Sequence, residues 1–193
     1  GEPTVWMGWM GNWDYANRLP MSWGQGALSI PRELNLVKTN RGYELRQRPV
    51  TALQKLRGYR VDTVLTKVGT NAPLREFHPS RNTYELIATF PLEHPAQQVG
   101  LNLCVGKGRK VALMYDRTTA NVTLDRRASG DVSFSEHFPR AVSAPLFDSG
   151  ESVTFHVFVD QSSVEVFVND GAVVLTSQIF PDPSDTGIEL LSL

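Results

Sequence analysis

Trp13, in a tryptophan-rich stretch near the start of the chain, is the residue best suited to contact a ligand. Trp6, Trp9 and Trp13 fall within one short stretch, and Trp13 has Asn12 before it and Tyr15 shortly after it. A flat indole beside a sugar ring buries the apolar C–H faces of the ring, while neighbouring polar groups meet its hydroxyls. The sequence therefore offers Trp13, Asn12 and Tyr15 as candidate carbohydrate contacts. The alternative is that these aromatic side chains only pack against one another.

The histidines and the cysteine do not have the spacing of a metal or redox site. The four histidines, at positions 78, 94, 137 and 156, are far apart in the chain, and His156 falls on the alternate face of an apolar strand. A hydrogen-bonded histidine is expected there rather than a ligand. Cys104 is the single cysteine, so it forms no internal disulfide, and its strand-like surroundings predict a small core residue. We predict no metal and no cofactor.

Composition and charge exclude several classes of partner. The formal net charge is -1, and Lys and Arg are scattered rather than clustered, which argues against nucleic acid as a partner. No apolar run approaches the ~20 residues of a membrane span. No initiator Met precedes Gly1, so we expect the natural chain to begin earlier. The lack of disulfides fits a cytosolic protein and many secreted bacterial enzymes alike.

The elements that must position these residues are short strands. Apolar and polar residues alternate over residues 84–90, 153–159 and 164–168, and residues 111–115 and 121–126 make a further pair. Each such run places one apolar face toward a core and one wetter face outward. Asn169-Asp170-Gly171 predicts a hairpin turn. Arg126 and Arg127 are expected at a solvated strand end. The best helix candidate, residues 51–60, is weakened by Gly58. Many short strands predict an all-β antiparallel two-layer sandwich.

The composition changes near residue 50. All four tryptophans and three of the four methionines precede residue 26, whereas the remainder relies on Val, Leu and Phe. This shift suggests two structural contexts. Six blocks stand out along the chain, in this order: residues 5–17 (VWMGWMGNWDYAN), 25–34 (QGALSIPREL), 45–50 (LRQRPV), 129–134 (SGDVSF), 156–171 (HVFVDQSSVEVFVNDG) and 178–181 (QIFP).

Together these blocks resemble glycoside hydrolase family 32, which includes levanases, inulinases and invertases. The resemblance implies a β-propeller catalytic domain followed by a C-terminal β-sandwich. Residues 1–48 would be a fragment of the last propeller blade, residues 49–56 a linker, and residues 57–193 the sandwich. In the family an aromatic residue of this blade lines the fructose pocket, and Trp13 is the position that best matches. Trp6 and Trp9 are expected to be structural.

The resemblance also shows which catalytic motifs are missing. A retaining glycosidase needs two carboxylates about 5 Å apart. The family supplies its nucleophile from an Asn-Asp-Pro-Asn-Gly motif, a second Asp from Arg-Asp-Pro, and its acid/base Glu before a Cys. Here Asn169-Asp170-Gly171 lacks the Pro-Asn, Pro181-Asp182-Pro183 lacks the Arg, and Cys104 follows a leucine. We therefore expect the catalytic motifs upstream of Gly1, a missing propeller domain, and no activity in this segment alone.

Three functions remain open from the sequence. The chain could be the C-terminal part of a β-fructofuranosidase, levanase or inulinase, acting on fructan or sucrose-type carbohydrate, with the sandwich supporting the propeller. It could instead be a fructan-binding carbohydrate module, or a structural or oligomerisation sandwich. The uncovered blade fragment, residues 1–48, is expected either to pack on the sandwich or to self-associate. A fructan hydrolase favours an extracellular or periplasmic location, and a cytoplasmic one stays open.

Overall fold

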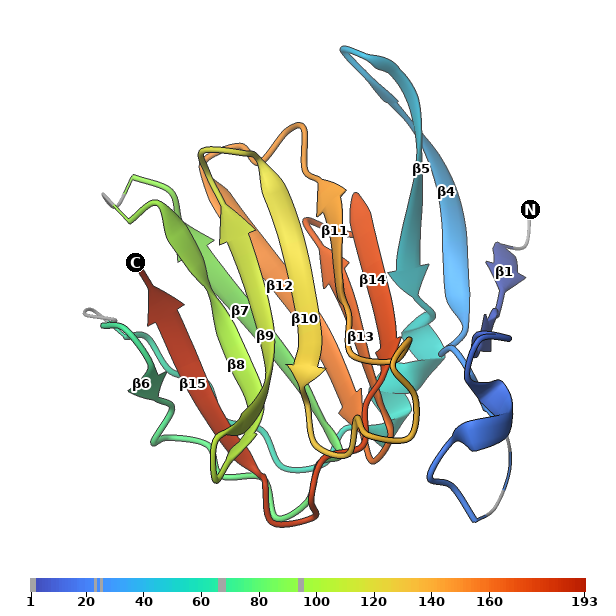
Figure 1. Ribbon diagram of the computed structural model, residues 1–193. Helices are drawn as coiled ribbons and strands as arrows, with labels where there is room; N and C mark the ends of the chain where they lie inside the picture. Colours follow the sequence, from blue (N-terminus) through green and yellow to red (C-terminus); the bar gives the residue numbers. More distant parts are fainter. Residues whose placement is uncertain (1–2, 23, 25, 66–68, 94–95) are drawn as a thin grey trace.

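Two antiparallel β-sheets pack face to face, with a smaller group of strands at one side (Figure 1). The computed structural model describes residues 3–22, 24, 26–65, 69–93 and 96–193. One sheet has the order β11-β10-β9-β8-β15-β6 and the other the order β14-β13-β12-β7. The six-stranded sheet consists of β6 (Ala72–Pro73), β8 (Gln98–Gly106), β9 (Arg109–Asp116), β10 (Asn121–Ala128), β11 (Ala141–Pro145) and β15 (Gly187–Ser192). The four-stranded sheet consists of β7 (Tyr84–Pro91), β12 (Ser152–Asp160), β13 (Ser163–Val168) and β14 (Val173–Gln178). The predicted all-β sandwich is confirmed.

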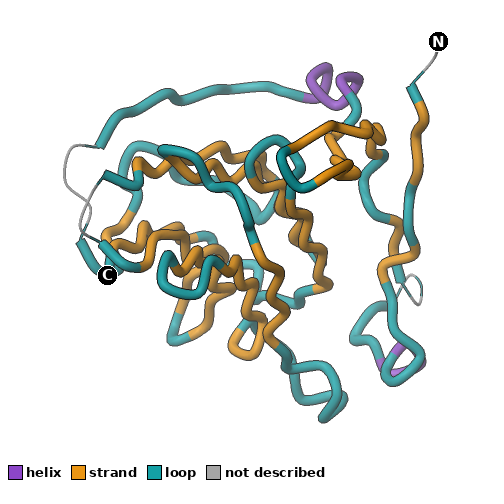
Figure 2. The backbone as a smooth tube through the Cα atoms, turned by 90° about the horizontal axis from the view of Figure 1, so that it is seen from above, coloured by secondary structure: helices purple, strands orange, loops and turns teal. Residues whose placement is uncertain are grey.

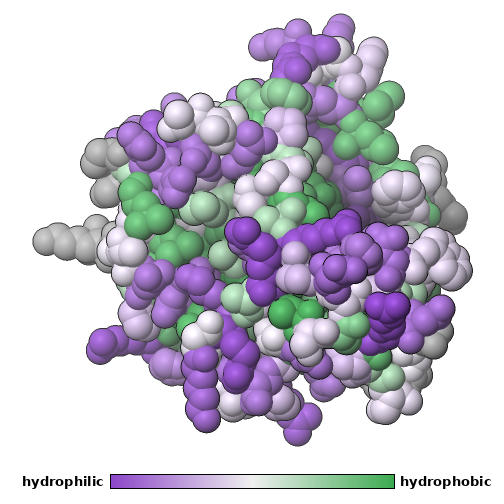
Figure 3. Space-filling model, in the orientation of Figure 1, coloured by the Kyte–Doolittle hydropathy of each residue, from purple (hydrophilic) through white to green (hydrophobic). Residues whose placement is uncertain are grey.

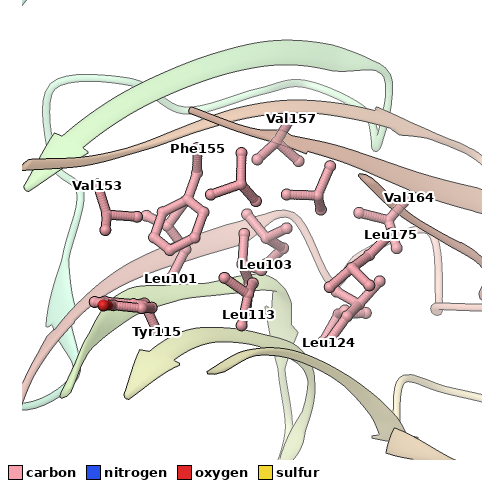
Figure 4. Close-up of a cluster of buried hydrophobic side chains, with 14 of the residues drawn as sticks. Leu101, Leu103, Leu113, Tyr115, Leu124, Val153, Phe155, Val157, Val164 and Leu175 are labelled. Carbon is pink, nitrogen blue, oxygen red and sulfur yellow. The ribbon is translucent and has the colours of Figure 1, made fainter. Parts of the chain in front are cut away.

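The core lies between the two sheets and follows from the period-two alternation of the strands. Leu101, Leu103 and Leu113 of the six-stranded sheet face Phe155 and Val157 of the four-stranded sheet, and all five are fully buried (Figure 4). The runs that the sequence predicted as strands therefore bury the faces that it predicted as apolar. Cys104 is buried in the same cluster, as predicted.

The connections also follow local sequence signals. Asn169, Asp170 and Gly171 all have positive φ and join β13 to β14, so the predicted hairpin is confirmed. Only Thr51–Leu56 of the weak helix candidate is helical, as the 3-10 helix η2. The chain after η2 runs along the outside of the sandwich (Figure 2), where Arg57 bonds Glu85 of β7. In the part of the chain that the structure describes, no helix is long and apolar enough to cross a membrane.

The described residues between 3 and 49, here called the N-terminal segment, form two small sheets. One has the order β1-β4-β5, from β1 (Thr4–Trp6), β4 (Arg32–Thr39) and β5 (Gly42–Pro49). The other pairs β2 (Trp9–Met10) with β3 (Ala27–Leu28), and the 3-10 helix η1 (Ala16–Arg18) lies between them in the chain. The segment packs beside β13 and β14 (Figure 1), which is one of the two outcomes expected for it. Self-association stays a prediction.

Several apolar side chains of the N-terminal segment remain uncovered. Figure 3 shows hydrophobic side chains at the surface around the β4–β5 hairpin. Trp6, Leu36, Tyr43 and Leu45 are each about half exposed or more. The pairings Trp6↔Arg32 and Leu36↔Leu45 place these side chains on one face of the β1-β4-β5 sheet. Exposed apolar side chains gathered on one small sheet are typical of a surface built for a second contact.

The expectation of a solvated strand end at Arg126 and Arg127 is wrong for Arg126. Its side chain is buried, and its guanidinium donates hydrogen bonds to the carbonyl oxygens of Phe138 and Gln178. The reason is that the loop between β10 and β11 folds back and covers this end of β10. Arg127 is exposed as expected and pairs with Asp125.

Candidate functional site

Trp13 is the most exposed tryptophan described and lies on a tight turn. The main-chain oxygen of Asn12 accepts hydrogen bonds from the main-chain nitrogens of Tyr15 and Ala16, at 3.1 and 2.8 Å. The side-chain oxygen of Asn12 accepts a further one from Asp14 at 2.9 Å. Such an Asx turn holds the backbone without tertiary help. It leaves the Trp13 side chain 83% exposed.

Trp9 lies beside Trp13, and its ring packs closely against two glycines. The two indole rings are 5.1 Å apart between centroids and tilted by 52°. A Cβ added to Gly11 would come within 2.4 Å of the Trp9 ring, and one added to Gly26 within 2.6 Å of its Nε1. Only glycine permits this close approach. The tryptophan pair, Trp9 and Trp13, is thus an aromatic surface of defined geometry, about half covered at Trp9 and open at Trp13.

Tyr15 lies on the opposite side of the turn and faces the sandwich. Its side chain is 5% exposed, its ring meets Phe138 edge-on at 5.2 Å between centroids, and its hydroxyl accepts a hydrogen bond from Arg126 at 3.1 Å. Ring and hydroxyl are both committed to interior contacts, so little of Tyr15 is left for a sugar. Of the three candidate residues, the structure brings Trp13 and the half-buried Asn12 to the surface and turns Tyr15 inward.

A second polar contact joins the N-terminal segment to the sandwich, and sequence reasoning missed it. Arg32 of β4 forms an ion pair with Glu165 of β13 at 2.5 Å, with 10% and 3% of the two side chains exposed. Glu165 also accepts a hydrogen bond from the main-chain nitrogen of Ile30 at 2.7 Å. Arg32 further bonds Thr176 and Gln47. We call the contact between the N-terminal segment and the sandwich the seam.

A small hollow opens along the seam. It lies between Leu28 and Ile30 on one side and Phe158 and the β12–β13 turn on the other, and its volume is about 190 Å³. Sites for small molecules typically measure about 300–1,000 Å³. The hollow is too small to make the seam the main binding site.

The perturbed carboxyl groups do not have the character of a glycosidase acid. Such an acid needs a raised pKa. The pKa of Glu85 is lowered, first by hydrogen bonds from Arg57 and then by His156. Hydrogen bonds likewise lower the pKa of three further carboxyl groups, those of Asp116, Asp125 and Asp182. These side chains are acceptors in structural contacts.

The titratable side chains of the sandwich likewise serve structure. Among the described residues no group of three His, Cys, Asp or Glu side chains is placed to hold a metal ion, and His94 lies outside the described residues. His156 Nε2 lies 2.6 Å from a carboxylate oxygen of Glu85, so His156 is hydrogen-bonded as predicted. Burial raises the pKa of the Cys104 thiol to about 12, which keeps it protonated and unreactive.

Comparison with known families matches both parts of the chain in order. Residues 52–193 match the model described as "Glycosyl hydrolases family 32 C terminal", and residues 1–49 match "Glycosyl hydrolases family 32 N-terminal domain". The first match covers the whole sandwich and the second covers the N-terminal segment with its tryptophan pair.

Individual relatives agree with this assignment. A levanase of Bacillus subtilis is 37% identical over 96% of this chain and 28% of its own length, and a levanase of Bacillus sp. (strain L7) is 34% identical over 97% and 21%. The crystal structure of an exo-inulinase from Aspergillus awamori superposes with a TM-score of 0.89 at 30% identity, covering 98% of this chain and 37% of that one. The chain thus spans between about a fifth and somewhat over a third of these relatives.

Proposed function

Because the chain belongs to glycoside hydrolase family 32, we propose that it works as the C-terminal part of an enzyme that cleaves β-fructosidic bonds in fructans. The observation that carries the proposal is that a family 32 N-terminal segment and a family 32 sandwich occur in one chain, joined through a buried seam. A free binding module would have no use for the N-terminal segment. The names of the relatives, levanase and exo-inulinase, support fructan as the substrate class.

In this proposal the sandwich is a support. Its four-stranded sheet holds β4 and β5 through Arg32–Glu165 and through the main-chain hydrogen bond from Gln47 to Gly171. The exposed apolar side chains of the β1-β4-β5 sheet are then buried by the remainder of a propeller. Burying a large apolar side chain contributes roughly 1.5–3 kcal/mol, so several exposed ones represent a considerable stabilisation.

Trp13 is the proposed substrate contact within this chain. Its exposed indole supplies an apolar plane for a fructose ring, with Asn12 beside it for hydroxyl groups. The catalytic carboxylates are proposed to come from the part of the enzyme that carries the family's other motifs. This chain by itself is expected to bind fructans weakly and to hydrolyse none.

The proposal is tested with the isolated chain and with a chimera. The isolated chain is incubated with levan, inulin and sucrose, and released reducing sugar is measured; we expect none. In the chimera, this chain replaces the matching part of the Bacillus subtilis levanase, and we expect fructan hydrolysis that a Trp13→Ala variant loses in large part. Hydrolysis by the isolated chain, or a folded chimera without activity, would contradict the proposal. Tight binding of fructo-oligosaccharides by the isolated chain would favour a carbohydrate-binding module instead.

A further inference from the structure

We infer that Arg126, a residue of the sandwich, is a positioning residue for Trp13 and thereby a determinant of substrate binding. The inference rests on the proposed function for the role of Trp13. It adds that the sandwich does more than hold the N-terminal segment in place: it sets the orientation of the one turn that carries the exposed indole.

Arg126 is a buried cation without a carboxylate partner. Within the described residues no Asp or Glu oxygen lies within 4.0 Å of its guanidinium; three other oxygens take its hydrogen bonds. Nε donates to Phe138 O at 2.9 Å, one terminal nitrogen donates to Gln178 O at 3.3 Å, and the other donates to the Tyr15 hydroxyl at 3.1 Å. Its carbon centre lies 4.0 Å from the centroid of the Phe138 ring. A planar guanidinium that donates from all three of its nitrogens and stacks on a ring is restricted to one orientation.

Two of the three acceptors belong to the sandwich, and the third belongs to the N-terminal segment. The Arg126 guanidinium therefore fixes the position of the Tyr15 hydroxyl relative to the sandwich. A cation buried without an anion is costly unless each donor is used. Displacing the Tyr15 hydroxyl would leave a buried donor unpaired, so the contact resists displacement of Tyr15.

Tyr15 and Trp13 are linked through the same turn. The main-chain hydrogen bond from Tyr15 to Asn12 closes the turn around Trp13. With Tyr15 fixed at one end and Trp9 held between Gly11 and Gly26 at the other, the indole of Trp13 has a defined direction. An ion pair between Asp14 of this turn and Arg140 of the sandwich, at 3.7 Å, is half exposed and is expected to contribute little.

The first test measures the conformation of the turn around Trp13 without any ligand. All four tryptophans precede residue 26, so tryptophan near-ultraviolet circular dichroism and acrylamide quenching report on the N-terminal segment and not on the sandwich. Tyr15→Phe removes only the hydroxyl, and Arg126→Met removes the guanidinium while keeping much of the side chain's length. We expect both to change the tryptophan dichroism and increase quenching, while the far-ultraviolet spectrum stays that of the sandwich. Arg127→Met, at the exposed neighbour, is the matched control and should change neither.

A double variant separates positioning from general destabilisation. If Arg126 acts on the turn through the Tyr15 hydroxyl, Arg126→Met with Tyr15→Phe should alter the tryptophan signals no more than Arg126→Met alone. Unchanged tryptophan signals in a folded Tyr15→Phe variant would overturn the inference. So would additive effects of the two substitutions, because they would mean independent roles. Tyr15→Phe keeps the ring packing, so the test stands even where Arg126→Met fails to fold.

The second test measures substrate binding in the levanase chimera. Losing one such hydrogen bond corresponds to roughly a two- to tenfold change in an equilibrium constant. We expect Tyr15→Phe to raise KM for a levan-derived and an inulin-derived trisaccharide by that factor, with a smaller change in kcat. An unchanged KM beside altered tryptophan signals would overturn the substrate part of the inference. An inactive but folded parent chimera would instead count against the proposed function, and the ligand-free test would remain valid.

Discussion

Replacing Arg32 by methionine is expected to detach the N-terminal segment while leaving the sandwich folded. Arg32 and Glu165 are almost fully buried, and among the described residues Glu165 has one other partner, the main-chain nitrogen of Ile30. Without Arg32 the carboxylate stays in a nearly dry site with its charge uncompensated. Water can reach it again only when the segment moves away from β13.

The size of the effect follows from this geometry. Removing one partner of a buried ion pair typically costs about 3–5 kcal/mol. Here the loss has an upper limit, because Glu165 belongs to the outer face of the sandwich and regains water once the segment leaves. The cost therefore falls on the free energy of docking, and the stability of the sandwich core changes little. Arg32→Met combined with Glu165→Leu removes both charges and should restore docking in large part.

Urea unfolding followed with two probes measures this. Tryptophan fluorescence reports the N-terminal segment, and far-ultraviolet circular dichroism reports mostly the sandwich strands. In the unsubstituted chain we expect one shared transition, and in Arg32→Met an earlier fluorescence transition followed by an almost unchanged dichroism transition. Limited proteolysis should release the segment only in the single variant. Coincident transitions at the original urea concentration in Arg32→Met would refute the reasoning, since the buried carboxylate would then need no partner.

Three further predictions concern single positions. Gly171→Ala should loosen the seam, because the added Cβ would lie 2.0 Å from Gln47 O. The control is Gly150→Ala, since Gly150 also has a positive φ but has open space around it. In urea unfolding, Gly171→Ala should lower the free energy of unfolding by about 1–3 kcal/mol more than Gly150→Ala does. The pKa of Glu85 is lower in the folded chain than its ordinary value of 4.5, so the ionised carboxylate stabilises the fold. This stabilisation is fully present above pH 4.5 and is lost as the pH falls through the folded-state pKa. Glu85→Gln should therefore flatten the acid side of a plot of unfolding free energy against pH. A pKa of about 12 should make Cys104 label with a thiol reagent at about pH 8 only after unfolding; prompt labelling of the native chain would show that the strand opens.

The strands and the core could be predicted from the sequence because they depend on local alternation. Each apolar run from residue 84 onward became a strand with its predicted face inside, and the turn at residues 169–171 had the residues that positive φ requires. The candidate site was only partly predictable. Trp13, Asn12 and Tyr15 were grouped by proximity, but a turn sends side chains in different directions, and Tyr15 entered the interior.

The seam could not be predicted from the alternation of apolar and polar residues along the strands. A period-two pattern tells which face of a strand is turned away from the sandwich core, but it does not tell whether another segment covers that face. Glu165, on the wetter face of its strand, and Arg126, at a strand end, both looked solvated from the sequence. Their partners in the N-terminal segment lie more than 100 residues away in the chain. One signal was present in the sequence. Phe167 shares the outer face of β13 with Glu165 and is itself buried, and an aromatic residue on a supposedly wet face predicts that something covers it. Arg32 covers this ring, with its guanidinium carbon 5.3 Å from the ring centroid, so the same arginine that neutralises Glu165 also covers Phe167.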